Sequence, residues 1–426
     1  MLKYQMKLQN LISRLERKHP KKIDLTLQRT FNLLKKLGNP QDKLKNVISV
    51  VGTNSKYSIC QSLKSLLNQE GYKCNLYLSP HLQSYNERFV YNDEEINDQN
   101  LIDLLEDIEK VLGDNQATLF EILTCAYLKY CEEFKNNVTI IEAGLFHQFD
   151  STNVFKKNLA SVIGSIGLDH LQWVNNKTID GIIHEKTIGL LNSNIFVNKQ
   201  SDNDITLKIK NSLKNNQSNK YFFGNDFNIL NAENSFIQYE DKLGSIILPE
   251  PNVQGDHQLA NISTSIALAR KLFNIKDKNI KKGITKINIK GRLQEINSGR
   301  LKTLIGPNRI FCDGGHNTNS AKVIANWIEQ QGQEVHLIVG MMKDKDHKNF
   351  FECFKDNVKS ITLIDIPNQN GAIQKEMLKK KLDGLNFNIK IGSSIKDSIK
   401  QNSKHENTIC LIIGSLYLIG EVLNLN

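Results

Sequence analysis

The 426-residue sequence lacks several features that would assign it to a specialised class of protein. Its seven cysteines include no C-x-x-C pair, and an odd number of widely spaced cysteines does not suit a disulfide framework. No apolar run approaches the roughly 18 residues that a membrane span requires. The N-terminus is amphipathic but has no signal-type apolar core or small-residue cleavage site. We therefore expect a cytoplasmic protein with reduced thiols and no membrane partner.

The sequence also lacks long basic tails, internal repeats and low-complexity segments. Lys and Arg number 55 against 45 Asp and Glu, which gives a formal net charge of +10, but the cations are scattered in short clusters such as 379–381. A duplex-binding face needs a basic stripe and a groove-entering motif, and neither is present. We expect no nucleic-acid partner, and a solvated surface that suits anionic ligands.

The remaining composition is that of a folded globular protein. Apolar residues make up 39%, to which 25 glycines are added. At roughly 150 residues per domain, the length predicts two or three domains. We expect the chain to act as a monomer on small molecules.

Short apolar runs alternate with longer segments of helical period, which predicts βαβ units around a parallel sheet. The pattern changes between 199 and 251, where polar, Asn-rich segments with alternating runs at 235–239 and 245–248 predict antiparallel strands appended to the main sheet. A fresh strand-helix series follows Gly291-Arg292, and we place the boundary between domains 1–297 and 298–426. The predicted strands are 46–51, 74–78, 138–143, 160–166, 195–198, 309–312, 334–339, 360–364 and 408–413, and the clearest helices are 57–69, 99–112, 119–134, 257–272 and 319–330.

Segment 50–58, VVGTNSKYS, runs from a strand end through a tight turn into a helix. Backbone N–H groups at a helix N-terminus, one lysine and one hydroxyl are what a nucleoside triphosphate with Mg²⁺ requires. The glycine that normally precedes the lysine of a phosphate loop is Ser55 here. On this segment alone, a strand-helix turn with a surface lysine stays an open alternative.

Polar residues follow three further predicted strands. Ser79 lies in LSPHL, Glu142 in IEAGL ahead of DSTN, and His170 in SIGLDH. The carboxyl ends of parallel strands meet at one edge of a sheet, where open α/β sheets bind ligands. Oxygen donors suit Mg²⁺, with a substrate phosphate completing its shell. Each residue alone could be structural, but together they favour a site.

With these motifs in this order, the chain resembles the folylpolyglutamate synthase and dihydrofolate synthase family of the Mur-type ATP-dependent ligases. The resemblance implies an α/β fold, with a Mur-ligase-type phosphate-loop domain built on a parallel sheet and a smaller Rossmann-like C-terminal domain. It runs from about residue 10 to the last strand. Its motifs are IDL (23–25), GTNSK (52–56), SPHL with NERF (79–82, 86–89), TLFE (118–121), EAGL with DSTNV (142–145, 150–154), SIGLDH (165–170), HEK (184–186), HQLAN (257–261), GRLQEI (291–296), DGGHN (313–317), GMMKDKD (340–346) and GSLYLIGEV (414–422).

The resemblance also implies an activity and its cofactors. A carboxylate of dihydropteroate, and of tetrahydrofolate in the bifunctional type, is activated by ATP and Mg²⁺ as an acyl phosphate and joined to L-glutamate. Whether dihydropteroate, tetrahydrofolate or both are accepted stays open at the level of the sequence.

Site residues follow from the matching motifs. The implied magnesium ligands are Ser79, Glu142 and His170. The implied catalytic residues are Lys56, His170 and Lys186, of which Lys186 would be carbamylated and support a second metal ion. The implied ATP contacts are Thr53, Asn54, Ser55, Lys56, Ser58, Asn261, Arg292, Asp313 and His316, although His316 could equally be structural.

The resemblance places the pterin against three segments. Phe120 offers a stacking face and Asp150 an acceptor for an amino-pyrimidine edge, although Phe120 could equally be core. The implied substrate contacts are Ile23, Asp24, Leu25, Thr118, Leu119, Phe120, Glu121, Phe149, Asp150 and Ser151.

The chain departs from the family pattern at three places. Ser55 and Tyr57 replace two glycines of the loop G-T-N-G-K-G-S, and a positive φ at Ser55 would cost roughly 1–2 kcal/mol. Residues 145–148, LFHQ, replace a Gly-Gly-Arg run, and no proline follows DGGHN. These changes keep a second hypothesis open, that of a non-catalytic relative that binds folate or nucleotide.

Overall fold

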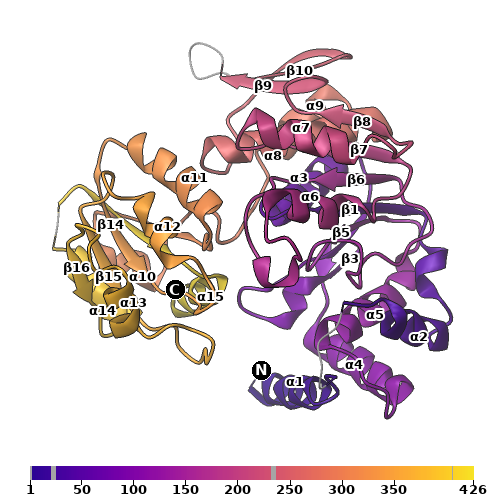
Figure 1. Ribbon diagram of the computed structural model, residues 1–426, viewed down its shortest axis with the longest axis horizontal. Helices are drawn as coiled ribbons and strands as arrows, with labels where there is room; N and C mark the ends of the chain where they lie inside the picture. The colour runs from indigo at the N-terminus through magenta and orange to yellow at the C-terminus, as the bar shows by residue number, and fades with distance from the viewer. Residues whose placement is uncertain (1, 21–24, 232–236, 405) are drawn as a thin grey trace. The chain divides into compact units, whose positions relative to one another are not determined.

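The computed structural model describes residues 2–20, 25–231, 237–404 and 406–426 (Figure 1). The predicted site residues Ile23 and Asp24 lie outside this range. The chain divides into two compact units. Unit 1 comprises Met1–Pro80, Ser84–Pro251 and Ala260–Ile287, and unit 2 comprises His81–Gln83, Asn252–Leu259 and Asn288–Asn426.

The last crossing between the units falls at Ile287/Asn288, earlier than the expected boundary at 297. The reason is a short strand, β12 (Gln294–Glu295), that pairs antiparallel with β13 (Arg309–Asp313) of the second sheet. The sequence pattern gave no sign of the two short segments, 81–83 and 252–259, that also belong to unit 2.

Unit 1 is built on an eight-stranded sheet of order β4-β3-β2-β5-β1-β6-β7-β8. The six strands from β2 to β8 in this order are parallel, and β3 and β4 are antiparallel at one edge. The bounds are β1 (Asn46–Val51), β2 (Cys74–Tyr77), β3 (Phe89–Tyr91), β4 (Glu94–Glu95), β5 (Val138–Glu142), β6 (Ala160–Ile163), β7 (Asn194–Val197) and β8 (Asn219–Phe222). The central strands are almost wholly buried, as continuous apolar runs predict for a parallel sheet covered on both faces.

The helices of unit 1 bury apolar stripes against this sheet and against one another. α3 packs on β1, β2 and β5 and also on α9, while α6 packs on α7. α1 lies along α4, where Lys7 pairs with Glu106 and Arg14 with Glu109. The bounds are α1 (Leu2–Glu16), α2 (Gln28–Lys36), α3 (Lys56–Gln69), α4 (Asp98–Leu112), α5 (Leu119–Cys131), α6 (Ile179–Thr187), α7 (Asn203–Ser212), α8 (Asp256–Phe273) and α9 (Asp277–Ile284), with 3₁₀ turns at Pro40–Lys43, Tyr85–Arg88, Glu132–Phe134 and Leu171–Trp173.

The Asn-rich region contains antiparallel strands, but their expected attachment to the main sheet was wrong. β9 (Phe227–Asn231), β10 (Ile237–Asp241) and β11 (Gly244–Leu248) form a separate three-stranded sheet, and only β8 joins the main one. Arg270 of α8 holds the β10–β11 turn by donating to Asp241 Oδ1 at 2.9 Å and to the Gly244 carbonyl at 3.0 Å. This buried charge-assisted pair ties the small sheet to the helix.

Unit 2 is a Rossmann-like layer structure around a six-stranded sheet of order β12-β13-β17-β14-β15-β16. All pairings except β12–β13 are parallel. The strands are β14 (Glu334–Val339), β15 (Ser360–Leu363), β16 (Ile389–Ile391) and β17 (Thr408–Ile413), and the helices α10 (Arg300–Ile305), α11 (Thr318–Glu329), α12 (His347–Glu352), α13 (Lys375–Lys381), α14 (Ile395–Asn402) and α15 (Leu416–Leu425). Two apolar clusters, one on each face of the sheet, form its core.

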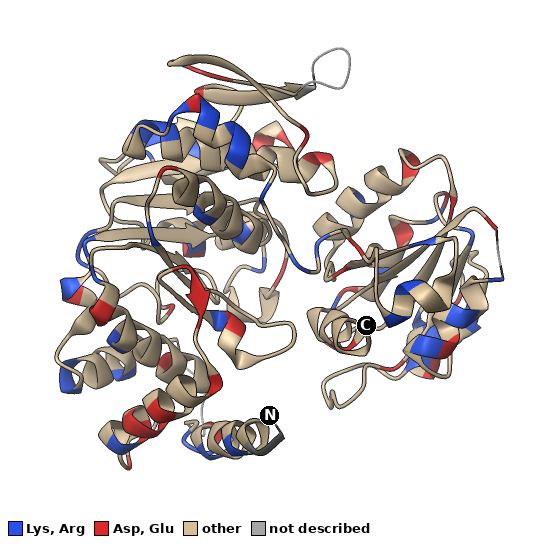
Figure 2. Ribbon diagram, turned by 180° about the vertical axis from the view of Figure 1, so that it is seen from behind, with Lys and Arg blue, Asp and Glu red and all other residues tan. Residues whose placement is uncertain are grey.

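The surface charge follows the scattered pattern expected from the sequence. In the view of Figure 2, Lys and Arg occur on helices and loops of both units and do not form one continuous stripe. Among the described residues, no helix combines the length and apolar character that crossing a membrane would require.

Candidate active site

The phosphate-loop segment connects β1 to α3, as its sequence predicts. The backbone N–H groups of Thr53 and Asn54 both donate to the Ser165 carbonyl, at 3.0 and 3.1 Å. The Thr53 hydroxyl donates to the Gly167 carbonyl at 3.0 Å. A Cβ added to Gly164 would lie 2.6 Å from the Asn54 carbonyl oxygen, so the loop after β6 closes on the phosphate-loop segment only because this position is glycine. The segment that follows β6 thus holds the phosphate-loop segment that follows β1 in place.

The first turn of α3 has the backbone arrangement of an anion-binding helix N-terminus. The first helical hydrogen bond runs from Ile59 N to Ser55 O at 2.9 Å. The N–H groups of Lys56 and Ser58 belong to the first turn of α3, and the first turn of a helix lacks intrahelical acceptors for its N–H groups. Their partial positive charge is the feature that binds phosphate at helix N-termini. Ser58 is buried within this first turn.

Ser55 adopts the left-handed conformation, with φ of 73°. The family loop has glycine at this position. The sequence predicts strain here if φ is positive, and φ is positive. A non-glycine residue in this region is strained by roughly 1–2 kcal/mol. The chain therefore retains the phosphate-loop backbone at a cost in stability.

Ser55→Gly is expected to stabilise the protein by up to about 1 kcal/mol, because relief of the strain exceeds the extra chain entropy that glycine loses on folding. The measurement is urea unfolding, read as a higher midpoint at an unchanged slope. Ser55→Ala is the matched control, because it removes the hydroxyl and keeps the Cβ. A stabilised Ser55→Ala, or a destabilised Ser55→Gly, would contradict the strain argument.

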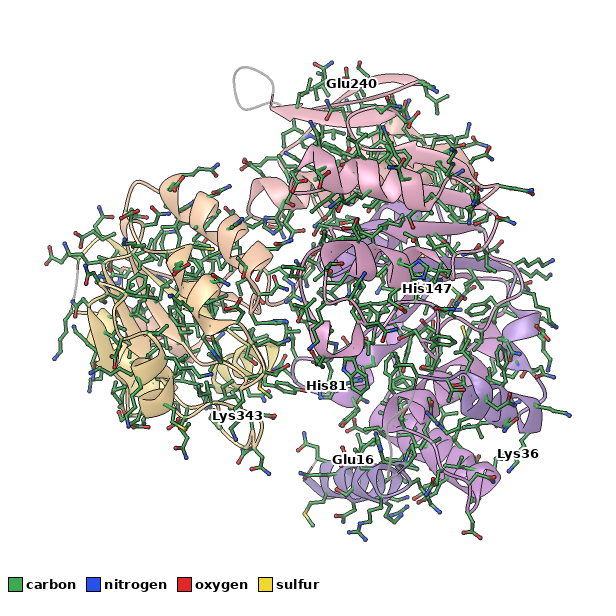
Figure 3. All side chains as sticks on the ribbon, in the orientation of Figure 1. Glu16, Lys36, His81, His147, Glu240 and Lys343 are labelled. Carbon is green, nitrogen blue, oxygen red and sulfur yellow. The ribbon has the colours of Figure 1, made fainter. Side chains whose placement is uncertain are left out.

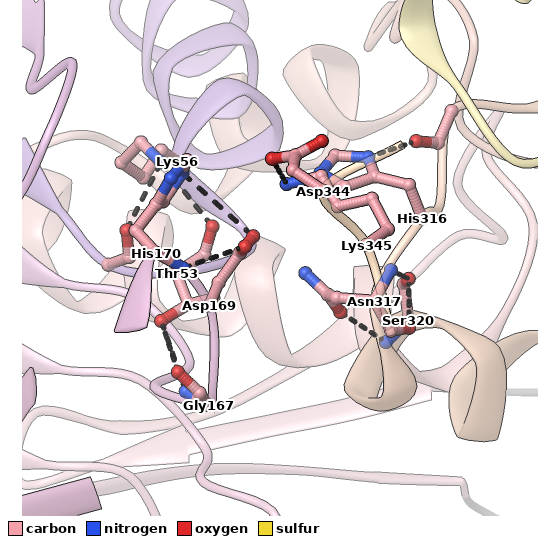
Figure 4. A network of polar contacts seen from close by, with 12 residues as sticks. Thr53, Lys56, Gly167, Asp169, His170, His316, Asn317, Ser320, Asp344 and Lys345 are labelled. Atoms are coloured by element: carbon pink, nitrogen blue, oxygen red, sulfur yellow. Dashed lines mark hydrogen bonds and ion pairs between the residues drawn. The ribbon is translucent and has the colours of Figure 1, made fainter. Parts of the chain in front are cut away.

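Two lysines converge on the carbonyl oxygen of Gly52. Lys56 Nζ donates to it at 3.1 Å and Lys186 Nζ at 2.9 Å. Lys56 Nζ also lies 3.9 Å from Oε1 of Glu142, which is the last residue of β5. Lys56 is labelled in Figure 4. Because Gly52 directly follows β1 and Lys186 lies in α6, residues far apart in the sequence meet at one strand end.

Lys186 is almost fully buried, at 5% exposure. Its burial, together with the charge of Lys56, lowers the pKa of the amine to about 7, although Asp169 and Asp150 oppose the shift. A lysine with an ordinary pKa is almost wholly protonated at neutral pH, whereas this one has a substantial neutral fraction. Carbamylation requires a neutral amine that can attack CO₂, so the chemistry implied for Lys186 has a physical basis in its surroundings.

The structure brings two of the three predicted magnesium ligands together. The backbone N–H of Ser79, just after β2, donates to Glu142 Oε2 at 3.1 Å, and Glu142 is 3% exposed. His170 follows β6 in a left-handed conformation, with its side chain 41% exposed and Nε2 4.0 Å from Asp169 Oδ2. Within the described ranges, no cluster of three or more His, Cys, Asp and Glu side chains is arranged to hold a metal ion. The three predicted magnesium ligands include only two residues of these types, Glu142 and His170, because Ser79 would contribute a hydroxyl.

Two of the predicted pterin contacts cap a helix. The Thr118 hydroxyl accepts from Glu121 N at 3.2 Å, and Glu121 Oε2 accepts from Thr118 N at 2.7 Å, a capping box at the start of α5. Arg29 of α2, which the sequence analysis missed, donates to Glu121 at 2.9–3.2 Å. The T-x-x-E spacing itself signals this cap, and contact of either residue with a pterin stays a prediction.

Phe120 and Asp150 lie close to Gly144. A Cβ on Gly144 would be 2.5 Å from the Phe120 ring and 3.2 Å from Asp150 Oδ2. Phe120 stacks on Tyr77, with centroids 5.8 Å apart. Asp150 accepts from Leu145 N at 2.7 Å and from Thr152, and burial raises its pKa against these hydrogen bonds.

The other predicted pterin contacts differ in exposure. Ser151 is buried and shares a 2.8 Å hydrogen bond with Thr124, whose hydroxyl also donates to Tyr77. Phe149 is 43% exposed, and Leu25 and Leu119 are partly exposed. The polar network of Tyr77 and Thr124 beneath Phe120 was not expected, because both residues lie in apolar runs that indicated only core.

In unit 2, Asp313 at the end of β13 organises the start of the next loop. Its Oδ2 accepts from Leu293 N at 2.7 Å and its Oδ1 from Gly315 N at 2.6 Å. Burial raises the pKa of Asp313, and the charge of Arg292 opposes this. His316 Nδ1 lies 2.8 Å from the Gly314 carbonyl, and Asn317 caps α11.

Arg292 and His257 share surroundings in unit 2. Arg292 Nη1 donates to the Gly291 carbonyl at 2.9 Å, and a Cβ on Gly314 would lie 2.8 Å from the same Nη1. The buried His257, to which sequence reasoning gave no role, has no hydrogen-bond partner for Nδ1 in the described part of the chain. Burial, and then the charge of Arg292, lowers the pKa of His257 to about 4.

Asn261, the remaining predicted ATP contact, belongs to unit 1. It lies in α8 and is 1% exposed, and its Oδ1 accepts from Asn198 Nδ2 at 2.7 Å. Asn198 in turn accepts from Thr264 at 2.9 Å. Its place in this network fixes the amide, while a role toward ATP stays a prediction.

Together, a strand-loop-helix phosphate site on a parallel sheet and a second, Rossmann-like unit define an ATP-binding α/β protein of the Mur-ligase type. A family model described as "Dihydrofolate synthetase, C-terminal domain" matches residues 302–425. The chain is 27% identical over 425 residues to the dihydrofolate synthase/folylpolyglutamate synthase of Bacillus subtilis, covering 93% of this chain and 94% of that protein. The chain is 25% identical to the dihydrofolate synthase/folylpolyglutamate synthase of Escherichia coli, and the match covers 97% of this chain and 94% of that protein.

Solved structures match the fold of this chain over almost its whole length. Escherichia coli FolC in complex with DHPP and ADP has a TM-score of 0.84 at 25% identity, covering 98% of this chain and 97% of that one. Mycobacterium tuberculosis folylpolyglutamate synthase complexed with ADP has the same fold, with a TM-score of 0.87 at 20% identity, covering 99% and 98%. In sequence and fold, the chain is thus similar over nearly its whole length to dihydrofolate synthases/folylpolyglutamate synthases.

Proposed function

We propose that the protein is an ATP-dependent ligase that joins L-glutamate to the carboxylate of dihydropteroate, and that it extends the glutamate tail of tetrahydrofolate. The observation that carries this proposal is the pair Lys56 and Lys186, both bonded to the Gly52 carbonyl at the N-terminus of α3. A carbonyl is a neutral acceptor. A phosphate oxygen at the same place would compete for Lys56 through a stronger, charge-assisted bond.

The reaction needs two steps because amide formation in water is uphill. The acceptor carboxylate attacks the γ-phosphorus of ATP, giving an acyl phosphate and ADP. The glutamate amine then attacks the acyl carbon, and phosphate leaves from the tetrahedral intermediate. Catalysis of the first step is mainly positioning and charge neutralisation, so Lys56 and the N–H groups of the first turn of α3 would hold the phosphoryl oxygens as charge builds on them.

The residues proposed for the metal fit a hard cation. Glu142 supplies a buried carboxylate and Ser79 a hydroxyl, with a backbone bond that holds them in register, and His170 would complete the protein ligands. When bound, Mg²⁺ would screen the negative charge of the phosphates. The carbamylated Lys186 would supply an anionic oxygen for a second ion.

In unit 1, further ATP contacts are proposed beside Lys56. Thr53, Asn54, Ser55 and Ser58 belong to the loop and first turn, and Asn261 to α8. In unit 2, Arg292, Asp313 and His316 stay the residues that the motifs predict for nucleotide binding. Asp313 would keep its carboxylate fixed through two backbone bonds while it accepts from a ribose hydroxyl.

The acceptor would lie against Phe120, with Asp150 and Ser151 beneath the ring and Phe149, Leu119 and Leu25 around it. Asp150 is already oriented by the Leu145 and Thr152 N–H groups, so its oxygens are held in place. The structure of Escherichia coli FolC in complex with DHPP and ADP supports small-molecule binding of this kind. The altered loop, including Tyr57, raises a non-catalytic relative as the alternative, and the comparisons give that alternative no support.

We also propose that the protein works as a cytoplasmic monomer. The seven cysteines are free thiols, and six of them are buried, which suits a reducing compartment. Light scattering at working concentration tests the monomer directly.

One assay tests the ligase proposal. Purified protein, ATP, Mg²⁺ and L-glutamate are incubated with dihydropteroate in one reaction and with tetrahydrofolate in another, and products are read by mass. Gain of one glutamate with each acceptor is the expected result. Product with dihydropteroate alone would restrict the enzyme to the first reaction, and binding of a pterin without product would establish the non-catalytic alternative.

A further inference from the structure

The loop that follows β5, residues 145–148, packs against the end of α6 that carries Lys186. Gln148 N donates to the Glu185 carbonyl at 3.4 Å, and the ring of Phe146 lies 5.4 Å from Lys186 Nζ. Phe146 is buried, and it adopts a left-handed conformation with φ of 56°. A bulky residue in this conformation is strained, so surrounding contacts must hold the loop in place.

The imidazole of His147 lies in the interior of unit 1 (Figure 3). Its side chain is 2% exposed, and among the described residues its Nδ1 has no hydrogen-bond partner. A buried polar atom without a partner destabilises a protein and calls for an explanation. Burial lowers the pKa of His147 to about 4, and the charge of Lys186 contributes in the same direction. The imidazole is therefore neutral at physiological pH, with one nitrogen that donates and one that accepts.

Resting on the proposed function, we propose that His147 is a positioning residue that donates an N–H hydrogen bond to the carbamate formed on Lys186. The neutral ε-amine attacks the carbon of CO₂ to form a C–N bond, one C–O π bond opens to leave an anionic oxygen, and the amine proton passes to water. The product has two oxygens that accept hydrogen bonds, where the amine had only donors. In the tautomer with its proton on Nδ1, the His147 imidazole then gains the acceptor that it lacks among the described residues.

This assignment explains both odd features of the loop together. An N–H bond to an anionic oxygen is stronger than one between neutral groups, and more so where water is excluded. The Phe146 ring lies beside the amine and so limits the access of water to the product. The substituted loop thereby supplies the carbamate with a hydrogen-bond donor of its own.

The test follows the carbamate itself, without turnover. Wild-type protein and variants are equilibrated with carbon-13-labelled bicarbonate, and the carbamate carbon is measured by NMR. Lys186→Met removes the signal and so assigns it. His147→Leu lowers the carbamate population at fixed CO₂ by about tenfold or more, the factor that a bond to a charged group supplies. His147→Asn, which keeps a side-chain N–H, retains most of the signal.

A matched control separates loss of the donor from loss of any buried histidine. His336→Leu removes a buried imidazole in β14 of unit 2 and leaves the signal unchanged. An undiminished signal in folded His147→Leu overturns the proposal, and so does loss in His147→Asn equal to that in His147→Leu. Should His147→Leu fail to fold, the Asn variant decides by its signal against wild type. Glutamate ligation by a wild-type protein without any carbamate signal refutes this inference alone, whereas a signal without ligation refutes the proposed function.

Discussion

Lys56→Ala is expected to lower kcat for ATP-dependent glutamate ligation by about 10²–10³-fold, the range found when a preorganised group opposite developing charge is removed. Lys56 Nζ bonds the Gly52 and Thr53 carbonyls, at 3.1 and 3.4 Å, at the start of α3. It lies where the phosphoryl oxygens are proposed to bind. Phosphate release, measured with dihydropteroate and glutamate both present, reports the effect.

The control for this variant comes from the same helix. Lys64 of α3 donates to the Asp93 carbonyl at 2.7 Å, away from the loop, so Lys64→Ala should keep near-parental kcat. Thermal unfolding of both variants shows whether either has lost structure. A folded Lys56→Ala protein that retained more than about a tenth of the parental rate would remove Lys56 from the proposed role.

The central strands of both sheets could be predicted from the sequence because each is a short, continuous apolar run. The predicted segments 46–51 and 334–339 coincide with β1 and β14. The edge strands could not be found in this way. β4 is two exposed glutamates, and β12 is a polar pair whose strand character comes only from its backbone bonds to β13. The same short pairing moves the boundary between units.

Convergence of the site residues of unit 1 was predictable in outline, because parallel strands end at one edge of a sheet. The strand ends do bring Ser79 next to Glu142, and Lys56 near Glu142. Contacts between side chains and backbone carbonyls could not be predicted, because nothing in the sequence shows that Lys186 shares the Gly52 carbonyl with Lys56. Similarly, Glu121 has the residue type of a ligand contact, while its oxygens are engaged by Arg29 and the α5 cap.

Lys186→Met is expected to have opposite effects on activity and on stability. Ligation should fall by about 10²-fold or more, since both the amine and its carbamate are lost. The apo protein, however, should become more stable at pH 6–7, because a methionine of similar length removes the cost of burying an ammonium.

The pH dependence identifies the cause. In the unfolded chain Lys186 holds its proton up to its ordinary pKa of 10.5, whereas in the folded protein it loses the proton near 7. The unfolded state therefore binds more protons between these values, and the stability contributed by this site rises with pH across that window. Below pH 7 both states are protonated and the full penalty is present. The advantage of Lys186→Met should be largest there and vanish as pH approaches 10.5.

Urea unfolding at several pH values, with chelator present and CO₂ removed, measures this difference. The exposed Lys214→Met serves as the control, and its effect should be small and independent of pH. A Lys186→Met protein that is less stable than the parent at pH 6, or whose difference does not change with pH, would mean that the amine is not buried as a costly charge. The surroundings that lower stability by burying Lys186 also leave it the neutral amine that its proposed chemistry requires.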